Sequence, residues 1–106
     1  MVSSISVVIP NFNGASLLKQ NLRSVIGALD HSGLNYEIIV SDDHSTDDSV
    51  SFLNQMHPEI LVLQNPSDRG FSKNINNGIA QAKGSLVLCL NTDVSLDKDY
   101  FKYQIP

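Results

Sequence analysis

The stretch Leu-Val-Leu-Cys-Leu-Asn-Thr-Asp at residues 86–93 decides the fold class. Its first five residues are apolar and follow Gly84-Ser85, a pattern typical of a strand that is buried on both faces. Such a strand predicts a parallel sheet between two layers of helices. The apolar run then changes abruptly to Asn91-Thr92-Asp93. Because open α/β sheets bind ligands where their strands end, we expect Asp93 to face a metal ion and a phosphate.

Other apolar runs and helical periodicities precede this stretch. Short apolar runs predict strands at residues 5–10, 36–41, 60–64 and 86–90, with Pro10 ending the first strand. Apolar residues at helical spacing predict helices at about residues 15–33, 45–56 and 71–82. Ser45 and Asp48 resemble a capping box that starts the second helix. Residues 95–98 resemble the start of a fourth helix that is cut short at Pro106.

The predicted helix at residues 71–82 has two distinct faces. One face carries apolar side chains, namely Phe71, Ile75, Ile79 and Ala82. The opposite face carries polar side chains, namely Lys73, Asn76 and Asn77. We expect the apolar face to pack on the sheet and the polar face to be free to meet a ligand.

The alternation of strands and helices predicts the topology. It indicates a three-layer α/β fold, with a mostly parallel sheet, right-handed crossovers and helices on both faces. If the strand order is 3-2-1-4, the direction of winding reverses between the first and fourth strands. Residues 11–14, 42–43 and 91–93 would then line one crevice at the carboxyl edge of the sheet.

Composition narrows the class of partner and the compartment. The chain has 106 residues, a formal net charge of −4 and no cluster of lysine or arginine, which argues against a nucleic-acid partner. The single cysteine, Cys89, is predicted to be an inert core thiol and excludes a disulfide framework. We find no signal peptide and no apolar run long enough to span a membrane, so a cytoplasmic setting is expected.

The chain lacks the common phosphate-binding motifs. Neither G-x-x-x-x-G-K-[ST] nor G-x-G-x-x-G follows the first predicted strand. An anionic ligand therefore needs another source of positive charge. A divalent cation on Asp93, Mn²⁺ or Mg²⁺, would supply it, because such a cation is commonly held by one or two carboxylates together with substrate phosphates.

Four blocks of sequence, taken in order, resemble a known family. They are Val-Val-Ile-Pro-Asn-Phe-Asn-Gly at 7–14, Ile-Ile-Val-Ser-Asp-Asp-His-Ser-Thr-Asp at 38–47, the segment 70–79 with Asn-Asn-Gly-Ile at its end, and Leu-Cys-Leu-Asn-Thr-Asp at 88–93. Together they resemble the nucleotide-sugar-binding half of a family 2, GT-A fold glycosyltransferase. The replacement of the first aspartate of the D-x-D metal motif by Asn91 resembles rhamnosyltransferase-like members.

The resemblance implies a set of nucleotide-sugar-binding residues. Asp42 or Asp43 would read the nucleotide base, Lys73 falls where many relatives carry arginine, and Asp93 would be the direct metal ligand. Asn76 matches the first residue of the family's Asn-x-Gly. The full implied set is Pro10, Asn11, Phe12, Asn13, Asp42, Asp43, Lys73, Asn76, Asn91, Thr92 and Asp93.

The resemblance also implies an activity. It is the metal-assisted transfer, with inversion, of a sugar from a nucleotide-diphosphate sugar to a hydroxyl of a glycan or lipid-linked acceptor, as in polysaccharide biosynthesis. Family members usually continue past the metal motif into an acceptor-binding half that carries the general base. We therefore expect residues 1–106 to be the N-terminal donor-binding part of the domain, inactive alone, with the base beyond Pro106.

The expected truncation and activity have two further consequences, and one alternative function stays open. Surface exposed by truncation would let the chain form homo-oligomers. The full-length protein would act at the cytoplasmic face of a membrane. The alternative function is a non-catalytic nucleotide or nucleotide-sugar binding module, whose ligand affinity would not change on chelation or on replacement of Asp93 by alanine.

Overall fold

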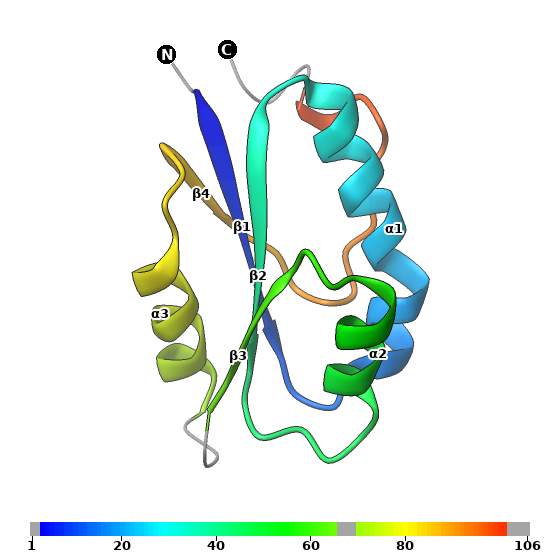
Figure 1. The fold of residues 1–106 in the computed structure, drawn as a ribbon, viewed down its shortest axis with the longest axis vertical. Coiled ribbons are helices and arrows are strands. Elements are labelled where there is room, and N and C mark those ends of the chain that lie inside the picture. The colour runs from blue at the N-terminus through cyan, green and yellow to red at the C-terminus, as the bar shows by residue number, and fades with distance from the viewer. Residues whose placement is uncertain (1–2, 66–69, 102–106) are drawn as a thin grey trace.

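A parallel sheet forms the centre of the molecule (Figure 1). The computed structural model describes residues 3–65 and 70–101. The described strands pair in the order β3-β2-β1-β4, which confirms the predicted order. Their bounds are Ser4–Asn11 for β1, Asn35–Asp42 for β2, Leu61–Gln64 for β3 and Leu86–Cys89 for β4.

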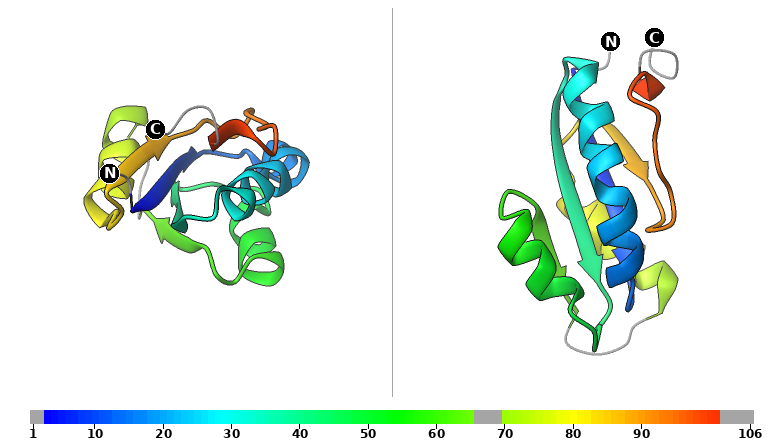
Figure 2. Two further views of the ribbon diagram at one scale, coloured as in Figure 1. Left: turned by 90° about the horizontal axis from the view of Figure 1, so that it is seen from above. Right: turned by 90° about the vertical axis from the view of Figure 1, so that its right-hand side faces the viewer.

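Helices cover both faces of the sheet, as predicted (Figures 1 and 2). The helices α1 (Ala15–Ser32) and α2 (Ser49–Met56) lie on one face, and α3 (Phe71–Gln81) lies on the other. Helix α1 ends where Gly33 adopts φ 75°, a left-handed conformation that glycine adopts without strain. Within the described residues, no helix combines the length and apolar character needed to cross a membrane.

The main hydrophobic core lies between the sheet and α1. Alternate residues of the central strand β1, Ile5, Val7 and Ile9, belong to this core because successive side chains of a strand point to opposite faces. Helix α1 contributes buried side chains at helical spacing, namely Leu18, Leu22, Val25 and Leu29. The amphipathic pattern of α1 therefore packs as the sequence predicts.

Helix α3 packs through a face that the sequence pattern did not predict. Asn74 and Gly78 are buried, whereas Ile79 is 40% exposed. Asn77, predicted to lie on the free face, is half-buried and donates a hydrogen bond to Asn65 Oδ1 at 2.8 Å. The reason is steric, because a Cβ at Gly78 would lie 2.4 Å from Val8 Cγ1, so glycine lets the helix approach the sheet closely.

The strand β4 is an edge strand, and the prediction that it is buried on both faces was wrong. It pairs with β1 alone among the described strands. Leu88 packs against the α1-side core, so Val87 and Cys89 point to the other side of the sheet. Helix α3 lies over β1 and β2 and leaves this part of β4 uncovered. Val87 is therefore 38% exposed, and Cys89 is an exposed thiol instead of a core residue.

Three local expectations also need correction. Strand β1 continues through Pro10 to Asn11, because proline removes only its own N–H donor from the ladder. Helix α2 begins at Ser49 and has no capping box, since its N-cap residue Asp48 makes no side-chain cap bond. Residues 95–97 are not helical, and helical residues begin only at Tyr100.

The segment that follows β4 returns along the α1 side of the molecule (Figure 2). Leu90 and Phe101 are buried in the main core. The backbone N–H of Leu96 donates to Ser24 Oγ at 3.0 Å. This path fixes the turn at residues 91–93 against the rest of the molecule.

Candidate functional site

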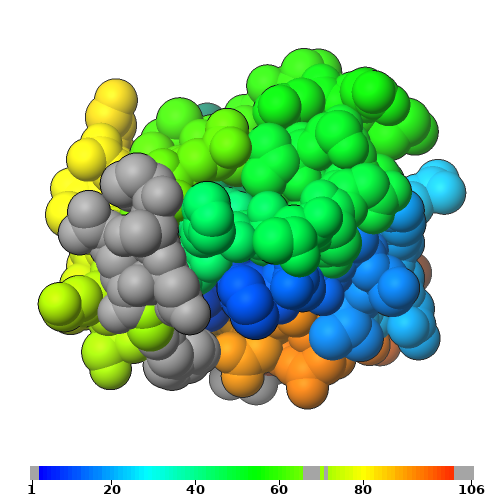
Figure 3. Space-filling model, turned by 90° about the horizontal axis from the view of Figure 1, so that it is seen from below, coloured from blue at the N-terminus to red at the C-terminus, as the bar shows by residue number. Residues whose placement is uncertain are grey.

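The segments that the sequence places around one crevice do meet at the carboxyl edge of the sheet. Figure 3 views the molecule from this end and shows the dark blue residues after β1 between the green residues after β2 and the orange residues after β4. A Cβ at Gly14 would lie 3.3 Å from the Thr92 side chain. The Asn11 side chain donates from Nδ2 to Asp42 Oδ1 at 2.8 Å.

Asp42 is a buried carboxylate with every oxygen engaged. It is 2% exposed. Its Oδ1 accepts hydrogen bonds from Asn11 Nδ2 at 2.8 Å and from Ser45 Oγ at 2.6 Å, and its Oδ2 accepts from the Ser45 backbone N–H at 2.9 Å. Because Asn11 ends β1 and Ser45 lies in the loop after β2, Asp42 holds the end of β1 and the loop after β2 in one arrangement.

Asn13 joins the same two loops from the other side. Its Oδ1 accepts from the backbone N–H groups of Thr46 at 2.7 Å and Asp47 at 3.2 Å, and its own N–H donates to Ser45 Oγ at 2.8 Å. Asn13 has φ 52°, a left-handed conformation that asparagine tolerates better than most residues. We refer to residues 11–15 and 42–47 together as the rim.

Asp47 connects the rim to two helices. Its Oδ2 accepts from the Ala15 N–H at 3.0 Å, at the start of α1, and its Oδ1 accepts from the Ser49 N–H at 3.0 Å, at the start of α2. Ser49 Oγ also donates to Asp47 Oδ1. Burial alone would raise the pKa of Asp47, but these hydrogen bonds from Ser49 and Ala15 hold it below its ordinary value of 3.8.

Asp43 faces the beginning of α3. It is 5% exposed, and its Oδ2 accepts from the Gly70 N–H at 3.1 Å. Behind it, a buried polar network links α3 to the sheet, in which Asn74 Nδ2 donates to the Ser41 carbonyl and Asn65 Nδ2 donates to Asn74 Oδ1, both at 2.8 Å. The paired aspartates thus connect to different elements of the fold.

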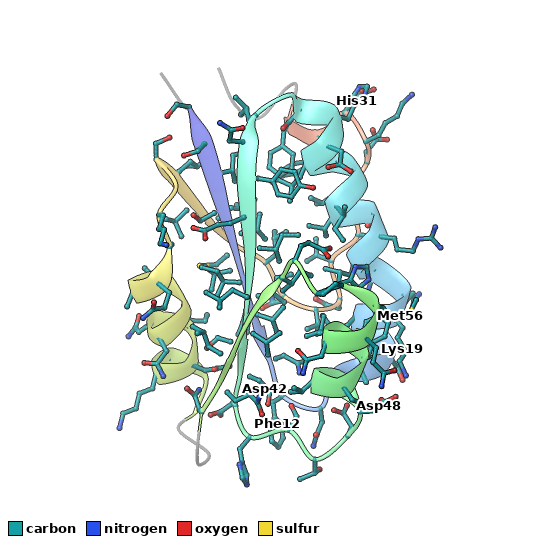
Figure 4. All side chains as sticks on the ribbon, in the orientation of Figure 1. Phe12, Lys19, His31, Asp42, Asp48 and Met56 are labelled. Carbon is teal, nitrogen blue, oxygen red and sulfur yellow. The ribbon has the colours of Figure 1, made fainter. Side chains whose placement is uncertain are left out.

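The two neighbours of Asn11 differ in exposure. Pro10 is buried within β1, opposite Ser41 of β2. Phe12 is 59% exposed and lies at the same end of the molecule as Asp42 (Figure 4). Since Asn11 and Asn13 are both fixed by side-chain hydrogen bonds, the backbone on each side of Phe12 is held while its ring faces solvent.

The turn at residues 91–93 presents one carboxylate. Asn91 and Asp93 are exposed. The carbonyl of Thr92 accepts from Asn21 Nδ2 of α1 at 3.0 Å, which anchors the turn beside the rim. The described residues contain no group of three or more His, Cys, Asp or Glu side chains that could hold a metal ion. Asp93 is therefore not part of such a group, and its role as a metal ligand stays a prediction.

Two predicted residues lie apart from the buried face of α3. Lys73 and Asn76 are exposed on that helix, whereas Asn74 and Gly78 are buried. Their roles stay predictions. Arg69, a further candidate from the sequence for contact with a diphosphate, lies outside the described residues.

Several residues of this edge have roles that the sequence did not predict. Ser45, Asp47, Asn65 and Asn74 shape the edge through the hydrogen bonds given above. Ser45 bonds Asp42 within one loop, but the bonds that join Asp47 to Ala15 and Asn74 to Ser41 connect different elements, so spacing alone could not reveal them. The only available signal was the density of Asp, Ser and Asn directly after predicted strands.

Comparison with known proteins relates the whole chain to one family. A model of the family described as glycosyl transferase family 2 matches residues 6–106. The dolichol-phosphate mannosyltransferase of Pyrococcus furiosus is 30% identical over 95 residues, which are 85% of this chain and 26% of that protein. The GalNAc(5)-diNAcBac-PP-undecaprenol beta-1,3-glucosyltransferase of Campylobacter jejuni is 33% identical over 96 residues, 87% of this chain and 30% of that protein. This chain thus spans less than a third of the length of either relative.

Solved structures share the fold. S. aureus TarS 1-349 in complex with UDP-GlcNAc superposes with a TM-score of 0.79 at 26% identity, over 93% of this chain and 29% of the TarS 1-349 chain. The mannosyltransferase PcManGT from Pyrobaculum calidifontis, in complex with GDP-Man and Mn²⁺, gives a TM-score of 0.77 over 92% of this chain and 30% of its own, at 21% identity. These likenesses confirm the expected fold class, while the rhamnosyltransferase-like subtype stays a prediction.

Proposed function

This chain belongs to glycosyl transferase family 2, and we propose that residues 1–106 form the donor-binding part of a sugar-transferring enzyme. The observation that carries the proposal is the convergence of the rim and the turn at residues 91–93 at one edge of the sheet. The donor is a nucleotide-diphosphate sugar, and TarS, which shares the fold at 26% identity, was solved with UDP-GlcNAc.

In this proposal the nucleotide lies along the rim. Phe12, exposed between two fixed neighbours, offers an aromatic face to a base. Asp42 accepts three hydrogen bonds within the chain, and Asp43, which is also buried, accepts from the Gly70 N–H and from Asn65 Nδ2. Asp42 shapes the rim through these bonds, and base recognition stays with either Asp42 or Asp43, as the family resemblance implies. Lys73 and Asn76 are assigned to the donor site from the family resemblance alone.

The carboxyl edge of the sheet carries several carboxylates, which repel a diphosphate. A bound diphosphate therefore needs a cation to neutralise its charge. Asp93 is exposed at the mouth of the site, and a single carboxylate suits Mn²⁺ or Mg²⁺ that also binds diphosphate oxygens. When bound, the cation would neutralise the leaving diphosphate. PcManGT was solved with Mn²⁺, but at 21% identity its likeness to this chain shows the fold alone. The cation proposed here therefore rests on the chemistry of Asp93.

The transfer itself is proposed to proceed with inversion to a hydroxyl of a glycan or lipid-linked acceptor. Such a transfer needs a general base within hydrogen-bond reach of the attacking oxygen, and we place that base outside residues 1–106. The glucosyltransferase of Campylobacter jejuni is named for an undecaprenol-linked substrate. By analogy we propose that the complete protein works at the cytoplasmic face of a membrane.

Calorimetry with a panel of nucleoside diphosphates, with and without Mn²⁺, tests donor binding. We expect at least one nucleotide to bind the folded chain, and to bind more weakly after chelation. Failure of every nucleotide to bind a demonstrably folded sample would overturn the proposal. Binding that is unaffected by chelation would instead support the alternative, a non-catalytic nucleotide or nucleotide-sugar binding module.

A further inference from the structure

The carboxylate of Asp47 accepts hydrogen bonds from the N-termini of two helices, α1 and α2. Helices α1 and α2 both begin beside Asp47, whose two oxygens accept from the first backbone N–H of each helix, that of Ala15 and that of Ser49. Neither helix has an acidic residue in its own first turn. Within residues 3–65 and 70–101, Asp47 is the carboxylate that bonds both of these positions, and it comes from the loop between β2 and α2.

The N-terminus of a helix attracts anions for two reasons. Its first N–H groups have no partner within the helix, and the helix dipole places partial positive charge there. A helix that follows the first strand of an α/β sheet can hold a phosphate in this way. Here the position at α1 is already filled by a charge of the protein itself, and Asp47 remains exposed beside the donor site.

We propose that Asp47 is a positioning residue that keeps diphosphate away from the N-termini of α1 and α2. The negative charge repels an incoming phosphate, and the hydrogen bonds to Ala15 and Ser49 occupy the donors that a phosphate would use. The donor diphosphate is thereby directed to a cation on Asp93. Only this last consequence rests on the proposed function, because exclusion of phosphate by Asp47 is a property of the rim itself.

The test measures binding of inorganic pyrophosphate to the 106-residue chain in metal-free buffer. Asp47→Asn removes the charge with little change in shape, and Asp47→Ser keeps a hydroxyl that can cap α2. Both variants are expected to bind pyrophosphate about tenfold more tightly than the wild type, on the scale of a charge at a helix terminus. A rim residue with a merely structural role would give unchanged or weaker binding.

Asp48→Asn is the matched control. Asp48 is the adjacent residue and has the same charge, but its carboxylate pairs with Lys19 Nζ at 2.7 Å instead of bonding a helix N-terminus (Figure 4). Its removal changes the net charge equally and is expected to leave pyrophosphate affinity within about twofold of wild type. An equal gain in the Asp47 and Asp48 variants would reduce the effect to net charge and overturn the proposal.

A measurement on the wild type keeps the proposal testable if both Asp47 variants fail to fold. In NMR titrations with pyrophosphate, the amide signals of Ala15 and Ser49 are expected to stay in place without metal. A saturable shift of these two signals would contradict exclusion. Failure of the proposed function gives a different result, namely no binding of UDP to the wild type in the presence of Mn²⁺.

Discussion

Asp42 shows what a residue's sequence position reveals and what it leaves out. Its place directly after a predicted strand was enough to assign it to the carboxyl edge of the sheet. Its hydrogen bond with Asn11 could not be predicted, because Asn11 ends a different strand, 31 residues away in the sequence. The same holds for Asp47, whose partners at α1 lie outside its own loop.

Replacement of Asp42 by alanine is expected to lower the free energy of unfolding by about 2–3 kcal/mol, because it leaves the Asn11 amide and the Ser45 N–H without their buried acceptor. Urea unfolding followed by circular dichroism measures the change. Asp48→Asn, at an exposed ion pair, should stay within about 0.5 kcal/mol of wild type. Equal losses of unfolding free energy in the two variants would contradict the role of Asp42 in holding the rim.

Asp47 predicts a specific pH dependence of stability. Its pKa in the folded chain is lower than the ordinary 3.8, so the charged form is favoured by folding. Its contribution to stability is therefore present above pH 3.8 and lost as the pH falls through the lowered pKa. Unfolding free energies of wild type and Asp47→Asn should differ at neutral pH and converge below that range. A difference that persists undiminished in strong acid would contradict this account.

At the scale of elements, α1 and α3 differ in how well their patterns predict packing. Helix α1 carries a regular apolar stripe, and that stripe is buried. In α3 the buried positions are Asn74 and Gly78, because buried partners in the sheet satisfy the Asn74 amide and glycine permits close approach. A pattern of hydrophobicity cannot reveal a helix that packs through polar and small residues.

Gly78→Ala tests the close approach of α3. The added Cβ would lie 2.4 Å from Val8 Cγ1, so we expect a loss of about 1–3 kcal/mol of unfolding free energy. Gly27→Ala is the matched control within α1, where an added Cβ would meet nothing within 4 Å and should stabilise the helix by about 0.5–1 kcal/mol. Two denaturant titrations suffice, and a stabilising Gly78→Ala would refute the packing described for α3.

At the scale of the whole molecule, alternation of strands and helices predicted both the sheet order and the two helical layers. It did not predict which strands would be covered, because coverage depends on where each helix crosses the sheet. Helix α3 crosses β1 and β2, so the apolar sequence of β4 includes exposed Val87 and Cys89. The carboxyl edge was predictable because parallel strands place all of their following loops at one end.

The exposed side of β4 predicts an accessible thiol. Cys89 in the folded chain should react with an aromatic disulfide reagent at a rate within about tenfold of that in the urea-unfolded chain, because no described element covers it. The release of the coloured thiol, followed spectrophotometrically, gives both rates. Protection by several orders of magnitude would mean that this side of β4 is covered in solution, for example by a second copy of the chain.

We propose that a cation on Asp93 holds the donor diphosphate, so the affinity of the chain for UDP should depend on Mn²⁺. Wild type and Asp93→Ala are compared by calorimetry, with Asp97→Ala as an exposed carboxylate control from the segment that follows the turn. We expect Mn²⁺ to tighten UDP binding to the wild type and to Asp97→Ala, and to leave the UDP affinity of Asp93→Ala unchanged. Equal Mn²⁺ dependence in all three proteins, or none in any of them, would contradict it.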